Sequence, residues 1–220
     1  MTNNDVYKTL DRCLNEPRLG RLYETMKAKY AGLTISHNWE HVLRVALKAT
    51  RIGAEEKADL GMVLAAAFLH DIGFLSHPKE PKKHNEYGAK ECVAYLSEWS
   101  AEEKSVVSSC ILRHKGKYPG YEGLEPETLE EKVLCDADQV DKFGWIGLLQ
   151  VIKVYDEYGS LGYKNFSTMR GLGEGIAEAS RIELYTDSAK KMALALRDPP
   201  YADVSKTVLA ELAFYEEWNR

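Results

Sequence analysis

The feature that most constrains this chain is an apolar run that ends in an adjacent histidine and aspartate. The run extends from Met62 to Leu69 and leads directly into His70 and Asp71. A run this apolar predicts a buried helix, and Gly73 allows the chain to turn just after the pair. The imidazole and the carboxylate are therefore expected at a helix end, at the edge of the core.

The rest of the chain repeats apolar residues at intervals of three and four, without sustained alternation of the strand type. This pattern predicts an all-α fold of one body. We expect the helices at about residues 5–29 with a break at Pro17, 36–53 with Ser36 as its cap, 55–70, 85–98, 101–115 opened by Ser100, 126–158, 172–197 and 201–218.

Composition limits the class of protein. The net charge of -5 is spread over both halves, which argues against a broad nucleic-acid footprint. No apolar run approaches the length of a membrane span, and the start lacks the pattern of a signal peptide, so a cytoplasmic location is expected. The cysteines form no C-x-x-C pair and are expected to be reduced thiols: Cys13, Cys92, Cys110 and Cys135.

Two further residues complete a set of ligands for a metal. His41 lies in the predicted helix 36–53, and Asp138 lies in the middle of the predicted helix 126–158, where a buried carboxylate needs a partner. With His70 and Asp71 they supply two imidazoles and two carboxylates, which suit Mn, Fe, Co, Ni, Zn or Mg and leave coordination positions open. Each of these residues alone is unremarkable in a helical protein, and only their combination predicts a metal site.

Four stretches of the sequence resemble the HD-domain metal-dependent phosphohydrolases. They are residues 41–46 (HVLRVA), 69–73 (LHDIG), 84–89 (HNEYGA) and 134–141 (LCDADQVD). The likeness covers about residues 35–150. In overall plan the chain is similar to small bacterial HD hydrolases, some of which act as nucleotide pyrophosphohydrolases. It implies a single HD-type domain over 1–220, a helical bundle with its metal core at 35–150 and a helical C-terminal extension at 151–220.

The resemblance also implies roles for single residues. His41, His70, Asp71 and Asp138 would be the metal ligands, with His37 competing with His41 and Asp136 with Asp138. Phe74 occupies a position where some subgroups have a lysine or a glutamate, which disfavours those subgroups. Further histidines bind a second metal in some members, and His84 and His114 fall at such places.

By the same resemblance, a metal-activated water attacks phosphorus. Asp71 would orient the water, and His84 or His114 would donate a proton to the leaving oxygen or bind phosphate oxygens. Lys82, Lys83 and Lys115 flank these histidines and are expected to bind the phosphate.

The predicted function is a phosphatase or pyrophosphohydrolase that acts on a nucleotide or another small phosphorylated compound. Two alternatives stay open: metal-dependent hydration or oxygenation of an unphosphorylated substrate, and a regulatory module that binds a ligand without turnover. No membrane or nucleic-acid partner is expected, and apolar faces on the terminal helices would allow a homodimer. Gly171 to Gly175 lacks the strand and the lysine of a phosphate-binding loop and is interpreted as a flexible entry to a helix.

Overall fold

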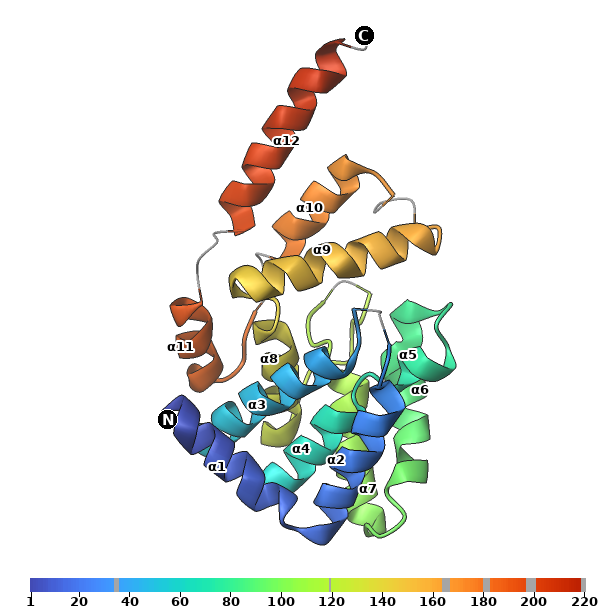
Figure 1. Ribbon diagram of the computed structural model, residues 1–220, viewed down its shortest axis with the longest axis vertical. Coiled ribbons are helices and arrows are strands. Elements are labelled where there is room, and N and C mark those ends of the chain that lie inside the picture. Colours follow the sequence, from blue (N-terminus) through green and yellow to red (C-terminus); the bar gives the residue numbers. More distant parts are fainter. Residues whose placement is uncertain (34–35, 119, 164–166, 180–182, 197–200, 219–220) are drawn as a thin grey trace. The chain divides into compact units, whose positions relative to one another are not determined.

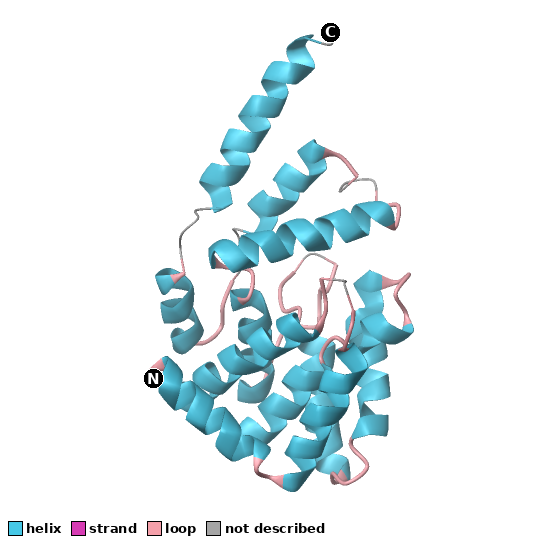
Figure 2. Ribbon diagram, viewed as in Figure 1, coloured by secondary structure: helices cyan, strands magenta, loops and turns pink. Residues whose placement is uncertain are grey.

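The structure is a computed structural model that describes residues 1–33, 36–118, 120–163, 167–179, 183–196 and 201–218 (Figure 1). Within these ranges every regular element is a helix, as Figure 2 shows, which confirms the predicted all-α fold. The chain divides into two compact units. The first contains residues 1–141 and 184–191, and the second contains residues 142–183 and 192–220.

The first unit begins with two helices separated at the predicted proline. Helix α1 spans Asn3–Leu14 and starts with a capping box between Thr2 and Asp5. Helix α2 spans Pro17–Tyr30, with the proline at a first-turn position that needs no backbone donor. One predicted helix with an interruption is thus two helices.

Helix α3 spans Trp39–Glu56, and its cap is Asn38 rather than the predicted Ser36. The Asn38 side chain accepts from the backbone N–H of His41, while Ser36 instead contacts His37. The helix also continues past Gly53, the predicted end. Gly53 serves packing, because a Cβ there would lie 2.8 Å from Cδ2 of Leu60.

The apolar run forms helix α4, Leu60–Leu69, which is capped by Asp59. The predicted start at Glu55 was wrong, because residues 55 and 56 belong to α3. From Val63 to Leu69 every side chain is fully buried. Next come α5 (Ile72–Ser76), the 3₁₀ turn η1 (Pro81–Lys83), α6 (His84–Glu91), the 3₁₀ turn η2 (Cys92–Tyr95) and α7 (Ala101–Arg113), the last with the predicted Ser100 capping box.

The predicted helix 126–158 is interrupted. Helix α8 spans Leu129–Val140 and α9 spans Gly144–Ser160, with Gly144 at a φ of 74° that favours glycine. Asp138 therefore lies in the last turn of α8 and not in the middle of a helix. The boundary between the two compact units falls at this interruption.

The second unit contains α9, α10 (Met169–Ala179) and α12 (Tyr201–Trp218), while α11 (Asp187–Ala195) crosses the unit boundary. Gly171 to Gly175 lie inside α10, so the interpretation as a flexible entry was wrong. The core of this unit includes Leu148, Val151, Tyr155 and Ile176. The predicted break at residues 198–200 lies outside the described residues.

Two further sequence predictions concern the whole chain. All four cysteines are free thiols, and Cys92, Cys110 and Cys135 are buried. Among the described residues, no helix has both the length and the apolar character that crossing a membrane requires.

Candidate metal centre

Six buried side chains of the first unit converge from different helices. We call them the His–Asp cluster, and none is more than 4% exposed: His41, His70, Asp71, His84, His114 and Asp138. All of them lie within a turn of a helix end. His41 is in the first turn of α3, His70 and His114 cap the C-termini of α4 and α7, and Asp138 is in the last turn of α8.

Glycine 73 brings two of these helix ends together. A Cβ at Gly73 would lie 2.1 Å from the backbone oxygen of His84 and 2.8 Å from the backbone nitrogen of Gly88. Only glycine therefore allows α5 to approach α6 this closely. The contact sets Asp71, the N-cap of α5, beside His84, the first residue of α6.

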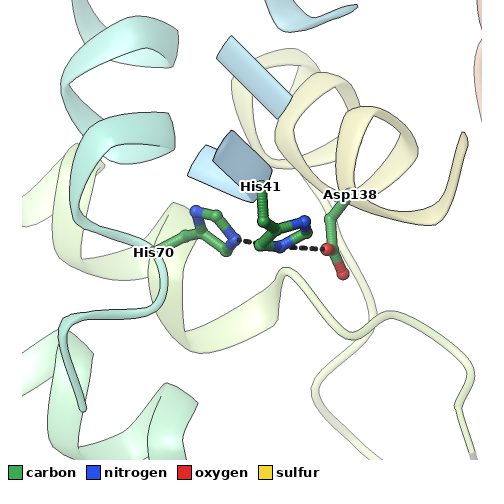
Figure 3. Close-up of side chains that lie close together, drawn as sticks. All are labelled: His41, His70 and Asp138. Carbon is green, nitrogen blue, oxygen red and sulfur yellow. Dashed lines mark hydrogen bonds and ion pairs between the residues drawn. The ribbon is translucent and has the colours of Figure 1, made fainter. Parts of the chain in front are cut away.

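The first group of potential ligands contains His41, His70 and Asp138 (Figure 3). Nε2 of His41 lies 3.2 Å from Nε2 of His70 and 3.5 Å from Oδ1 of Asp138. One ligand atom from each of the three residues lies within 4.8 Å of the others. This spacing allows one ion to contact all three.

The second group contains Asp71, His84 and His114. Nε2 of His84 lies 3.1 Å from Nε2 of His114 and 3.6 Å from Oδ1 of Asp71. The other oxygen of Asp71, Oδ2, lies 3.2 Å from Nε2 of both His41 and His70. Asp71 therefore contacts both groups and is placed to bridge them.

Three of the histidines have their tautomer set by the backbone. Nδ1 of His70, His84 and His114 lies 2.6–2.8 Å from the carbonyl oxygen three residues earlier. A carbonyl only accepts, so each Nδ1 carries the hydrogen. In the neutral imidazole Nε2 is then left as a lone pair that faces the cluster.

His41 is oriented by a carboxylate instead. Its Nδ1 lies 2.8 Å from Oδ2 of Asp141, which also accepts from Arg44 at 2.9 Å and, through Oδ1, from Lys48 at 2.6 Å. Although burial raises the pKa of Asp141, the hydrogen bond from His41 and the charge of Lys48 hold it well below its usual range. The pKa of His41 lies well above its usual range: burial lowers it, but the adjacent carboxylates of Asp138, Asp141 and Asp71 outweigh the burial.

The donor set fits a cation. Burial, followed by the charge of Lys115, lowers the pKa of His114 to about 3 and that of His84 well below its usual range. Two Nε2 lone pairs therefore face each other at 3.1 Å, which is repulsive unless a cation lies beside them. Oδ2 of Asp71 is also buried without a hydrogen bond, because its contacts with His41 and His70 lack hydrogen-bond geometry. Buried imidazole and carboxylate donors of this kind match a divalent metal.

The structure brings together most of the residues that the sequence singled out. His41, His70, Asp71 and Asp138 meet, His84 and His114 join them, and Nζ of Lys115 lies 3.4 Å from Oδ2 of Asp138. It does not bring the other two lysines to the cluster. Lys82 and Lys83 are exposed on η1, and Lys83 pairs with Glu80 at 2.9 Å. Their role in binding phosphate stays a prediction.

The two alternatives left open by the sequence are distinguished by geometry. Asp136 points away from the cluster, because its carboxylate accepts from the backbone N–H groups of Tyr185 and Thr186 and from the Thr186 hydroxyl. His37 belongs to neither ligand group and stacks on Phe74. The geometry therefore favours His41 and Asp138 as ligands.

The partnership of Asp141 with His41 is the feature that sequence reasoning missed. Two signals in the sequence could have indicated it. Asp141 lies three residues after Asp138, and Arg44 and Lys48 follow His41 at helical spacing, so a basic face was available next to the predicted ligand.

Comparison with known proteins places this cluster in a wider context. Residues 38–142 match the family described as HD domain. The uncharacterized protein YpgQ of Bacillus subtilis (strain 168) is 32% identical over 114 residues, which are 51% of this chain and 54% of YpgQ. This chain thus spans about half the length of that curated relative.

Several solved structures share the fold. A predicted HD superfamily hydrolase from an uncultured Thermotogales bacterium is 23% identical, with a TM-score of 0.58 over 90% of this chain and 94% of the other. A Lactobacillus plantarum protein is 22% identical, with a TM-score of 0.64 over 93% and 98%. Bacillus subtilis YpgQ in complex with ADP is 21% identical in the structural alignment, with a TM-score of 0.52 over 86% and 95%.

Proposed function

We propose that this chain, in which residues 38–142 form an HD domain, is a metal-dependent phosphohydrolase that acts on a nucleotide or another small phosphorylated compound. The observation that carries the proposal is the pair of buried ligand groups joined by Asp71. A site with two adjacent divalent ions is a recurring solution for phosphate-ester hydrolysis.

In this proposal His41, His70 and Asp138 would hold one ion, His84 and His114 would hold a second, and Asp71 would be a ligand available to both. Bound divalent ions would supply a Lewis acid for a phosphoryl oxygen and lower the pKa of a water molecule. The orphaned Oδ2 of Asp71 supports the bridging role, since no hydrogen bond competes for this oxygen.

The proposal changes the role expected of two histidines. To act as a proton donor, His84 or His114 would need a proton on Nε2 in addition to the one on Nδ1. Burial disfavours that cationic form, and both Nδ1 atoms already donate to carbonyl groups. We therefore favour ligand roles for both, the alternative that the sequence left open.

Charged groups beside the cluster support an anionic substrate. The Lys115 side chain is 14% exposed, and its ammonium group lies next to Asp138. It can therefore also reach a ligand that enters there. A cation near a phosphate offsets charge on the transferring group. The relative YpgQ has been solved in complex with ADP, which supports testing phosphorylated nucleotides first.

The test is release of phosphate and pyrophosphate from nucleoside mono-, di- and triphosphates by the Mn²⁺-loaded chain. The His70→Ala variant removes one ligand. His77→Ala is its matched control, because His77 also lies just after the apolar run but is exposed and pairs with Glu91. We expect loss of turnover and of bound metal in His70→Ala alone.

A different outcome would redirect the proposal. If the wild-type chain retains Mn²⁺ but releases neither phosphate nor pyrophosphate from any of these nucleotides, the proposed phosphohydrolase activity is wrong for this substrate class. Hydration or oxygenation of an unphosphorylated compound, or ligand binding without turnover, would then account for the same metal centre.

A further inference from the structure

His37 is a buried histidine that the proposed metal centre does not use. It lies between Ser36 and the cap of α3, and its Nδ1 is 2.9 Å from the Ser36 hydroxyl. Its ring stacks on Phe74 at 3.8 Å between centroids, and Phe74 stacks in turn on His84 at 4.1 Å, each pair with an interplanar angle of 19°. The three rings form a column that ends at a member of the second ligand group.

The position of His37 relates it to both ligand groups. Its ring centroid lies 5.8 Å from that of His41 in the first group and 6.3 Å from that of His84 in the second. It is 7% exposed, whereas the side chains of the His–Asp cluster do not exceed 4%. His37 thus lies beside both groups without belonging to either.

The contacts of His37 leave one ring nitrogen for another partner. Nδ1 is occupied by the Ser36 hydroxyl, which can donate to it, and Nε2 would then carry the hydrogen. Stacking on Phe74 fixes the plane of the ring. An oriented donor next to a charged site is the arrangement that binds an anion with little loss of conformational entropy.

We propose that His37 is a substrate-binding residue whose Nε2–H donates a hydrogen bond to a phosphoryl oxygen held at the metal centre. This assignment rests on the proposed function. It also explains Phe74: at this position an aromatic ring supports His37 on one face and His84 on the other.

The experiment separates the ring from its hydrogen bond. His37→Phe retains an aromatic ring against Phe74 and removes the donor, whereas His37→Gln places an amide N–H near the position of Nε2. The matched control is His77→Phe, because His77 also contacts a serine through Nδ1, at 3.0 Å from Ser76, and stacks on Tyr87 at 3.7 Å, but on the surface.

The readouts are bound Mn²⁺ per chain, melting temperature and the affinity of inorganic phosphate for the Mn²⁺-loaded chain. We expect His37→Phe to retain wild-type metal content and to bind phosphate about tenfold to a hundredfold more weakly, the range for a hydrogen bond to a charged group. His37→Gln should recover part of the affinity, and His77→Phe should match the wild type.

Three outcomes would overturn the assignment. Loss of Mn²⁺ in His37→Phe would make His37 a ligand, and unchanged phosphate affinity would make it a packing residue. Absence of phosphate binding to the loaded wild-type chain would remove the anion site altogether. Since binding is measured without turnover, failure of the proposed hydrolysis would be a separate result.

Discussion

Replacing Asp141 by asparagine tests whether the orientation of His41 controls the metal centre. Asp141 is 2% exposed and accepts from His41, Arg44 and Lys48 at distances of 2.6–2.9 Å. The change is nearly isosteric and removes the negative charge. His41 can still meet an amide oxygen, but the amide no longer balances two cations.

The magnitude follows from where each partner lies. Carboxylates that orient a ligand histidine typically change metal affinity by about 10- to 100-fold when mutated, which is about 1.4–2.8 kcal/mol. Breaking a fully buried ion pair costs about 3–5 kcal/mol, but the Arg44 and Lys48 side chains are 26% and 18% exposed, so water screens part of this loss. We expect the free energy of unfolding to fall by about 2–3 kcal/mol, a loss that a typical domain tolerates.

Asp136→Asn is the matched control, because Asp136 is another buried carboxylate of α8 and accepts three hydrogen bonds, none of them from the His–Asp cluster. Both variants should lose stability in urea unfolding of the metal-free chain. Only Asp141→Asn should also lose Mn²⁺ affinity, measured by titration calorimetry. Equal Mn²⁺ affinities in the two variants would refute the reasoning, because the loss would then be general to α8.

Three further predictions follow from the same cluster. Burial lowers the pKa values of His37 and His114 to about 3, so these imidazoles take up protons when the metal-free chain unfolds below about pH 6.5. The free energy of unfolding, measured in urea with EDTA, should therefore be lower at pH 5 than at pH 7. A flat profile would contradict this. Despite burial, the carboxylates around His41 raise its pKa well above the usual range, so Mn²⁺ binding near pH 7 should release about one proton. Calorimetry in two buffers of different ionisation enthalpy detects this proton. A binding enthalpy that does not depend on the buffer would contradict the prediction. Gly73→Ala should destabilise the chain by at least about 3 kcal/mol and reduce bound Mn²⁺, because the new methyl group would overlap the backbone of His84. The control is Gly32→Ala, at a glycine with open space around it and a φ of 76°, which should keep its metal. Equal metal content in both variants would refute the role of the close approach.

Much of the fold could be predicted because local signals agree with it. Pro17 separates two helices, Ser100 opens α7, and the apolar run forms a fully buried helix. The errors occurred at helix ends, where neighbouring signals compete. Ser36 and Asn38 are both good caps, and the structure uses Ser36 to contact His37 instead.

The ligands could be predicted as residue types in order, but their grouping could not. The sequence offered His41, His70, Asp71 and Asp138 as one set and, through the resemblance, His84 and His114 at positions of a second metal, whereas the structure arranges the six side chains as two groups around Asp71. That arrangement depends on the approach of α5 to α6, which periodicity along one helix does not encode. A glycine after the His-Asp pair indicates a turn, and only the structure shows that the backbone of His84 occupies the space a Cβ would need.

The way in which the histidines are held explains why the cluster forms at helix ends. His70, His84 and His114 cap the C-termini of α4, η1 and α7, and the Nδ1 of each donates to the carbonyl three residues earlier. The last carbonyls of a helix lack partners within the helix, so His70 and His114 each satisfy a backbone acceptor, while the Pro81 carbonyl accepts from both the backbone N–H and Nδ1 of His84. The same bond fixes the tautomer and turns Nε2 away from the helix toward the centre. One local interaction, repeated at three helix ends, therefore presents three oriented nitrogen donors before any metal binds.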